Sequence, residues 1–107
     1  MKIAIPLFGD RISPHFATAP EALFVQTERR RVCTTLKINL ERLSSTDRRP
    51  KFLGLGVQTL ICGGIDETTR SWFEKRGVLV MADRMGKARE VLEQYLKETR
   101  KKKQAGG

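Results

Sequence analysis

The sequence is poor in the residues from which ordinary metal sites and disulfide networks are built. Its 107 residues include one histidine, His15, and two cysteines, Cys33 and Cys62. Two cysteines are too few for a disulfide framework, so a reducing cytoplasm is the simplest expected setting. The usual zinc sites are excluded as well, because the chain has no Cys-x-x-Cys pair, no second histidine and no cluster with zinc-ligand spacing.

Long apolar runs are also missing. None approaches the roughly 18 consecutive apolar residues that span a bilayer, so we expect no membrane span. Residues 1–6 lack the apolar stretch and the small-residue cleavage site of a signal peptide. The hydrophobic fraction of 39% is nevertheless high enough for a folded core. The length predicts a single domain, which we assign to residues 1–99.

Acidic residues are outnumbered: 21 lysines and arginines stand against 12 aspartates and glutamates, which gives a net charge of +9. More than half of the excess lies in residues 84–107, which contain a run of four basic residues at 100–103. Residues 100–107 have no apolar periodicity and are predicted to form a flexible basic tail. Two interpretations stay open: solvated lysines that complement a helix dipole, or a surface that attracts nucleic acid, an anionic membrane or an acidic protein partner.

Hydrophobic patterning predicts an α/β domain with the element order β-β-β-α-β-α-β-α. The expected strands cover residues 2–7, 21–26, 31–40, 57–62 and 78–81, and the expected helices cover residues 45–55, 66–76 and 88–96. Residues 31–40 alternate between apolar and polar side chains, so this strand is expected to be half exposed. Pro50 suits only the first turn of a helix, so the first helix is expected to start late or to bend.

The strand pattern also predicts where a site would lie. The runs 2–7 and 57–62 are the most apolar, which places them at the centre of a mostly parallel sheet. If they are parallel neighbours, the loops that follow them meet at their carboxyl ends, where open α/β sheets bind ligands. His15 would then face the turn formed by Cys62, Gly63 and Gly64 across a crevice.

Four segments, in this order, resemble one protein family. They are Met1-Lys2-Ile3-Ala4-Ile5-Pro6, Ser13-Pro14-His15-Phe16, Ile61-Cys62-Gly63-Gly64-Ile65 and Val91-Leu92-Glu93-Gln94-Tyr95-Leu96. Together they are similar to the dinitrogenase iron–molybdenum cofactor biosynthesis family of nitrogenase accessory factor-like domains, in register over about residues 1–97. The resemblance implies a three-layer α/β/α sandwich of the ribonuclease H-like type, whose mixed sheet has five strands in the order 3-2-1-4-5 with strand 2 antiparallel.

The resemblance also implies a function. Members of this family are small non-enzymatic proteins that bind or carry the iron–molybdenum cofactor or its iron–sulfur precursors. The histidine of the family's His-Phe-Gly motif is implicated in cofactor binding and maps onto His15, which is followed here by Phe16 and Ala17. An alternative function stays open: a basic interaction module or nucleic-acid-associated module that holds no metal cluster.

The chemistry of metal ligands indicates two candidate residues. A neutral imidazole binds iron or molybdenum well, and a thiolate binds iron well, so His15 and Cys62 are the candidates. Each has a plainer interpretation, since His15 could be a surface residue of a turn and Cys62 a small buried hydrophobe. Cys33 is assigned no role.

Other residues at the same edge could contact an anionic cluster. Gly63 and Gly64 stand just before a helix, where backbone amides can cradle an anion, or the pair could simply permit the turn. Arg11, together with Arg84 and Lys87, could surround the crevice, or these side chains could be ordinary solvated charges.

Enzymatic chemistry is not expected. Two-metal phosphoryl transfer needs several carboxylates that converge on the centre of the sheet. The first strand carries none, and Asp10, Asp66 and Asp83 lie in separate turns. No residue orders His15 as part of a nucleophilic triad or dyad.

Overall fold

Strand β1 (Lys2–Phe8) lies at the centre of a mixed sheet in the computed structural model, which describes the backbone of residues 1–106 and the side chains of residues 1–99. Its inner residues are all buried, as a continuous apolar run predicts for a strand covered on both faces. The sheet order is β4-β3-β1-β5-β6, with β2 paired to β1 outside this path. β1 runs parallel to β5 and antiparallel to β3. The predicted strand order and orientations are therefore confirmed.

The predicted order of eight elements is confirmed, with two short additions. The other strands are β2 (Arg11–Ile12), β3 (Glu21–Glu28), β4 (Arg31–Asn39), β5 (Thr59–Ile61) and β6 (Leu79–Met81). The helices are α1 (Ser45–Gly54), α2 (Glu67–Glu74) and α3 (Ala88–Gly106), and a 3-10 turn, η1, covers Phe16–Thr18. β2 and η1 both lie in the segment that the sequence predicts as one loop after β1.

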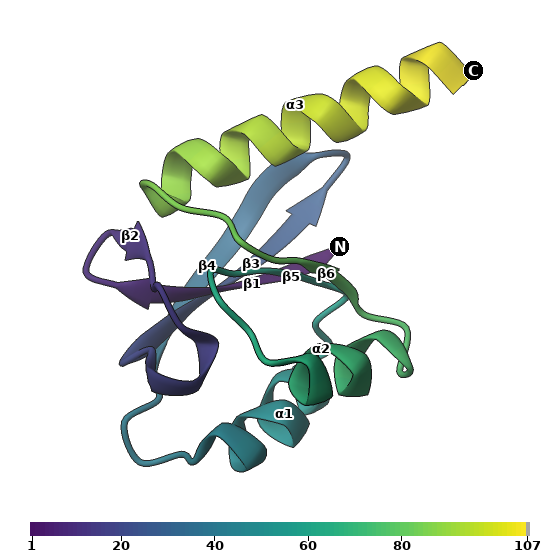
Figure 1. Cartoon of the computed structure of the whole chain (residues 1–107). Coiled ribbons are helices and arrows are strands. Elements are labelled where there is room, and N and C mark those ends of the chain that lie inside the picture. Colours follow the sequence, from purple (N-terminus) through teal and green to yellow (C-terminus); the bar gives the residue numbers. More distant parts are fainter. Residues whose placement is uncertain (107) are drawn as a thin grey trace.

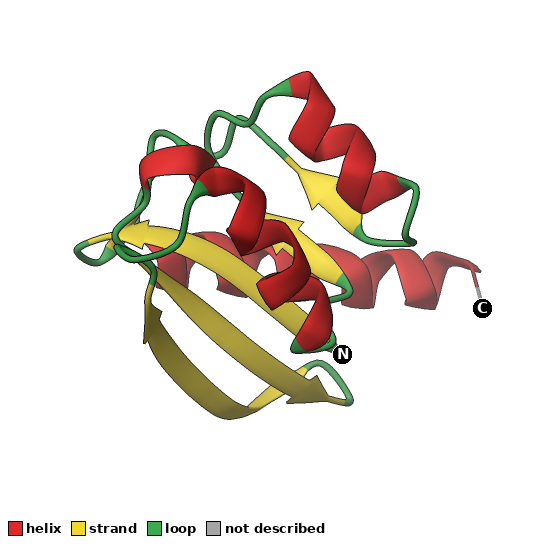
Figure 2. Ribbon diagram, turned by 90° about the horizontal axis from the view of Figure 1, so that it is seen from below, coloured by secondary structure: helices red, strands yellow, loops and turns green. Residues whose placement is uncertain are grey.

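Three layers make up the molecule. α1 and α2 cover one face of the sheet and α3 covers the other (Figures 1 and 2). On the α1–α2 side, the rings of Phe16 and Phe52 meet edge to face with centroids 5.4 Å apart, and those of Phe16 and Phe73 with centroids 5.8 Å apart. On the α3 side, Ile3, Ile5 and their neighbours pack against the helix. The chain therefore builds one apolar cluster on each face of the sheet.

The third predicted strand is more exposed than its alternation suggests. Within β4 only Ile38 is even half-buried, and 55% of the Leu36 surface is exposed. Leu40, expected on the same face of this strand, is fully buried but lies beyond its end. β4 is the edge strand of the sheet, and Figure 2 shows the helices covering the sheet mainly away from this border. An alternating pattern creates two faces, but a neighbouring element must cover one of them.

The first helix starts at the first residue of its predicted range, and not late as Pro50 suggests. The Ser44 side chain accepts a hydrogen bond from the Asp47 amide at 3.1 Å, which caps α1 and begins it at Ser45. Pro50 therefore lies inside the helix, and the expectation of a late start is wrong. The helix ends before Gly56, whose positive φ of 82° suits glycine.

The last helix contains most of the predicted basic tail. The backbone of α3 continues to Gly106, but the side chains of residues 100–107 lie outside the described residues, so the predicted flexibility of this tail stays a prediction. Among the helices in the described part of the chain, none is both long enough and apolar enough to cross a membrane.

Candidate functional site

The loop after β1 is tied to the sheet by backbone hydrogen bonds. Gly9, at φ 66°, turns the chain so that Arg11–Ile12 pairs with Leu7–Phe8. The Ser13 amide then donates to the Pro6 carbonyl at 2.9 Å, and Ser13 itself is buried. The following residues therefore start from a fixed position at the carboxyl end of β1.

His15 is exposed and directly precedes the buried Phe16. Its backbone is extended, with φ −137° and ψ 128°, so successive side chains point in opposite directions. Phe16 turns inwards into the aromatic cluster and is 1% exposed, whereas the His15 side chain is exposed. Ala17 lies in η1 and has no positive φ, so the backbone there does not require the glycine of the family motif. The imidazole is thus presented to solvent by a buried anchor.

Arg48 holds this loop from the α1 side, and sequence reasoning missed it. The residue is 4% exposed, and its guanidinium donates to the carbonyl oxygens of Phe16 at 2.8 Å, Leu40 at 3.0 Å and Leu43 at 3.1 Å. Burial lowers the pKa of the Arg48 side chain. The available signal is weak: Arg48 precedes the buried Phe52 by four residues, which places both on one helix face.

The turn after β5 meets the His15 loop, as the sequence predicts, but backbone hydrogen bonds join the two segments here in place of the predicted crevice. His15 and Gly64 form a parallel bridge, in which the Phe16 amide donates to the Gly64 carbonyl at 2.8 Å and the Gly64 amide donates to the Pro14 carbonyl at 2.7 Å. A Cβ atom on Gly63 would collide with two carbonyl oxygens of the loop, including that of Pro14 at 2.9 Å. The two loops are therefore joined at this point.

Close packing accounts for both glycines. A Cβ atom on Gly64 would lie 3.2 Å from the His15 Nδ1 atom, so the imidazole ring lies beside this residue. The amide of Gly64 is already committed to the loop, which leaves it no hydrogen for an anion. The geometry favours the interpretation that Gly63 and Gly64 permit two backbones to approach closely.

Cys62 behaves as part of the core. Its side chain is fully buried, and burial, with a smaller effect of the nearby Asp83 carboxylate, raises the pKa of the thiol to about 12. A thiolate is the form that binds iron, and it is strongly disfavoured here. The structure therefore opposes the predicted metal role of Cys62 and agrees with the interpretation of a small buried hydrophobe.

The predicted basic residues come to this edge from two loops. Arg11 and Lys87 form an antiparallel bridge, and the Arg84 amide donates to the Cys62 carbonyl at 2.9 Å. All three basic side chains are exposed. Asp83 is exposed beside them, so the edge carries a modest excess of positive charge.

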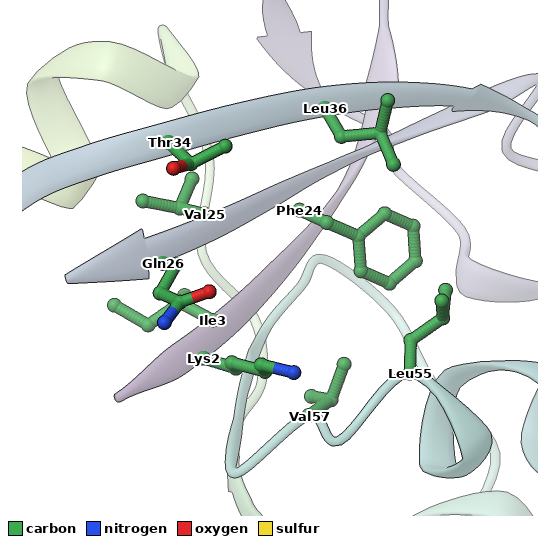
Figure 3. Close-up of a pocket in the computed structure, with 9 residues that line it drawn as sticks. All are labelled: Lys2, Ile3, Phe24, Val25, Gln26, Thr34, Leu36, Leu55 and Val57. Carbon is green, nitrogen blue, oxygen red and sulfur yellow. The ribbon is translucent and has the colours of Figure 1, made fainter.

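A distinct apolar hollow lies at the other end of the sheet, where β1 begins. Figure 3 shows it between the β3–β4 hairpin and the end of α1, with a volume of about 180 Å³. Its walls are formed by Lys2, Ile3, Phe24, Val25, Gln26, Thr34, Leu36, Leu55 and Val57. None of these residues is a histidine, cysteine or carboxylate, so the hollow offers no usual metal ligand.

The arrangement around His15 suits a preassembled cluster better than a bare ion. Within the described part of the chain, no three His, Cys, Asp or Glu side chains come together as an ion site. A metal cluster brings its own bridging sulfides, so one imidazole could anchor it.

Comparisons with solved structures agree with this fold. The crystal structure of PH0822 is similar to this chain, with a TM-score of 0.86 and 21% identity over 92% of this chain and 90% of that chain. MJ0327 of Methanocaldococcus jannaschii, named as a candidate dinitrogenase, has a TM-score of 0.78 and 20% identity over 92% of this chain and 89% of its own. At such identities, these likenesses show the fold alone.

Sequence comparison supplies the family. Among curated proteins, none matches the chain. The profile of the family described as dinitrogenase iron-molybdenum cofactor matches residues 1–98. The match includes both loops at the His15 edge and most of α3. The chain therefore belongs to the dinitrogenase iron-molybdenum cofactor family.

Proposed function

We propose that this chain is a non-enzymatic carrier whose cargo is a preassembled iron–molybdenum or iron–sulfur cluster. The cargo would dock at the carboxyl ends of β1 and β5, with His15 as its protein ligand. The observation that carries the proposal is the exposed imidazole on a fixed loop, beside the boundary between β1 and β5 where the strand order reverses, in a member of this family.

The fixed loop favours ligand binding because little motion has to be lost on binding. Backbone hydrogen bonds join the His15 loop to β1 and to the turn at Gly64, and the Arg48 guanidinium holds the Phe16 carbonyl from α1. A single protein ligand also suits a carrier, because release then requires the loss of one metal–nitrogen bond. We therefore assign His15 the anchoring role.

Charge at the edge supports an anionic cargo. Arg11, Arg84 and Lys87 are exposed there and would attract a negatively charged cluster from solution. Cys62 is left out of the proposed ligand set, because its buried thiol stays protonated at neutral pH.

Two observations support the proposal that the protein is not an enzyme: Asp66 caps a helix, and His15 lacks an orienting partner among the described residues. Asp66 caps α2 by accepting hydrogen bonds from the Thr69 amide at 2.9 Å and the Thr69 hydroxyl at 2.7 Å, and these bonds lower the pKa of its carboxyl group. This carboxylate therefore has a structural task. Among the described residues, none makes a hydrogen bond to the His15 side chain that would orient it for proton transfer.

The test is anaerobic titration of the protein with isolated iron–molybdenum cofactor and, separately, with a synthetic iron–sulfur cluster. Binding is followed by absorbance and by co-elution of metal with protein. We expect His15→Ala to lose most of the bound metal while its circular dichroism spectrum stays that of the parent. Equal metal retention by parent and His15→Ala would refute the assignment.

A matched control removes the exposed thiol. Cys33 is exposed and could bind iron adventitiously, so Cys33→Ser should bind as much cluster as the parent. Metal binding that disappears in Cys33→Ser and survives in His15→Ala would place the cargo elsewhere. The alternative function, a basic interaction module, concerns a different surface and does not depend on His15.

A further inference from the structure

The β3–β4 hairpin is closed by two arginines in an uncommon backbone conformation. Glu28 pairs with Arg31, so Arg29 and Arg30 form a two-residue loop. Both have positive φ, 51° and 64°, which the primed hairpin turns require and which Asn and Gly normally supply. Non-glycine residues in such a conformation are strained, and strain tends to persist where a function uses the side chains.

This arginine turn (residues 29–31) lies against α3. Figure 1 shows it beneath the middle of the helix, and Arg29 and Arg30 line a hollow of about 390 Å³ together with Tyr95, Leu96 and Thr99. Residues about 65 positions apart in the sequence are thereby brought to one corner of the molecule, at the end of the sheet opposite His15.

Among the described residues, the basic side chains of this corner make no ion pair within 4.0 Å, although Glu28 lines the same hollow. Within the described side chains, the ion pair within 4.0 Å joins Arg70 to Glu74, on α2. The Nε atom of Arg30 is buried and has no hydrogen-bond acceptor among the described residues. A buried guanidinium N–H without an acceptor is costly unless a ligand supplies one.

Basic residues outnumber acidic residues at this corner. Residues 28–31 and 97–99 contain four basic and two acidic residues, and the run of four basic residues at 100–103 follows directly in the sequence. Lys97 is exposed on α3, and the helix backbone carries the basic run 100–103 onwards from the same corner.

We propose that this basic corner, formed by the arginine turn and the α3 segment from Lys97 onwards, binds the phosphate backbone of duplex nucleic acid without sequence preference. Arginine suits phosphate because its planar fork donates two parallel hydrogen bonds. The energy of such contacts is electrostatic and independent of base sequence.

The residues of this corner are less suited to binding an anionic membrane or an acidic protein than to binding nucleic acid. Membrane-surface helices insert an exposed apolar face, and protein interfaces need apolar or aromatic anchors at their centre. Among the described residues, the large apolar side chains exposed at or beside this corner are those of Met1 and Val32, both at 46%. Tyr95 and Leu96 are half-buried and pack towards the sheet. An acidic protein or an anionic membrane would find charge here without an exposed aromatic anchor or a continuous apolar face.

The experiment is fluorescence anisotropy with a labelled 20-base-pair DNA duplex of arbitrary sequence, from 50 to 200 mM salt. About four phosphate contacts predict a log–log salt slope of about −3.6 and hence a loss of about 150-fold in affinity over this range. The double substitution Arg29→Asn/Arg30→Gly keeps a favourable turn and removes two contacts. Its slope should be shallower by about 1.8 and its affinity about 60-fold lower at 100 mM salt.

Controls separate the corner from net charge. The variant Arg42→Gln/Lys51→Gln removes two exposed charges from the α1 side, and it should bind like the parent. Absent binding, equal loss in the two double variants, or full affinity in the turn variant would overturn the proposal. Unlabelled duplex, polyglutamate and anionic phosphatidylserine vesicles are then compared as competitors at equal negative charge. The proposal would also be overturned if polyglutamate or the vesicles displaced the labelled DNA as effectively as unlabelled duplex. A melting temperature of the turn variant at or above that of the parent excludes misfolding.

Discussion

Replacement of Arg48 by methionine removes the donors that hold the His15 loop to α1. Methionine fills much of the space of the arginine stem but donates no hydrogen bond. The carbonyl oxygens of Phe16, Leu40 and Leu43 would then lose their contacts of 2.8, 3.0 and 3.1 Å to the guanidinium.

The expected cost follows from these three contacts. A buried polar group left without its partner costs about 1–3 kcal/mol. The Leu40 carbonyl keeps the hydrogen bond that it accepts from the Leu43 amide at 3.0 Å. The loss therefore falls mainly on the carbonyls of Phe16 and Leu43, and it amounts to about 2–6 kcal/mol. Release of the desolvated guanidinium charge offsets part of this cost. We therefore expect Arg48→Met to lower the free energy of unfolding by about 3 kcal/mol, which corresponds to a melting temperature lower by about 15 °C for a domain of this size.

Urea unfolding followed by the fluorescence of Trp72 measures this difference. Arg48→Lys keeps the charge but cannot reach three carbonyls with the same geometry, so it should fall between the parent and Arg48→Met. Arg42→Met, at an exposed position, should change the free energy of unfolding by less than about 0.5 kcal/mol. An Arg48→Met protein within 1 kcal/mol of the parent would refute the claim that this residue supports the loop.

Three further predictions test other parts of the structure. Gly63→Ala should lower the free energy of unfolding by more than about 3 kcal/mol, because its Cβ collides with carbonyl oxygens, whereas Gly54→Ala, which meets no atom within 4 Å, should raise it by up to about 1 kcal/mol. Denaturant titration compares the two. Arg29→Asn/Arg30→Gly should raise the melting temperature. Asn and Gly adopt positive φ with less strain than arginine, so each substitution should raise the free energy of unfolding by about 1 kcal/mol. Because burial raises the pKa of Cys62 from 9.0 to about 12, the unfolded thiol ionises first, and stability should fall between pH 9 and pH 12; Cys62→Ala should remove this component of the pH dependence.

Local patterns predict most of the fold because they report on neighbours along the chain. The apolar run of β1 and the capped start of α2 at Asp66 follow from a few adjacent residues, and both are confirmed. The strand order was implied by family resemblance, since periodicity says nothing about which strands pair. The exposure of β4 escaped prediction because it depends on which elements cover the sheet border, and β2 because two paired residues leave no readable pattern.

In the candidate site, too, some features could be predicted from the sequence, and others depend on contacts between distant residues. The meeting of His15 with the turn at Gly64 follows from two parallel central strands, and the structure confirms it. The reason for the glycines was not readable, because it depends on how closely a second backbone approaches. Arg48 was missed for a related reason: its acceptor on Phe16 lies 32 residues away in the sequence.

The central claim is that the cargo docks at His15. Anaerobic ¹H–¹⁵N spectroscopy of the labelled protein, with paramagnetic iron–molybdenum cofactor added, tests it most directly. Signals near the metal broaden, so we predict loss of the His15 ring resonances and of the amide signals of Ser13, His15, Phe16 and residues 63–65. Broadening centred on the exposed thiol of Cys33, with the His15 signals unchanged, would contradict the account.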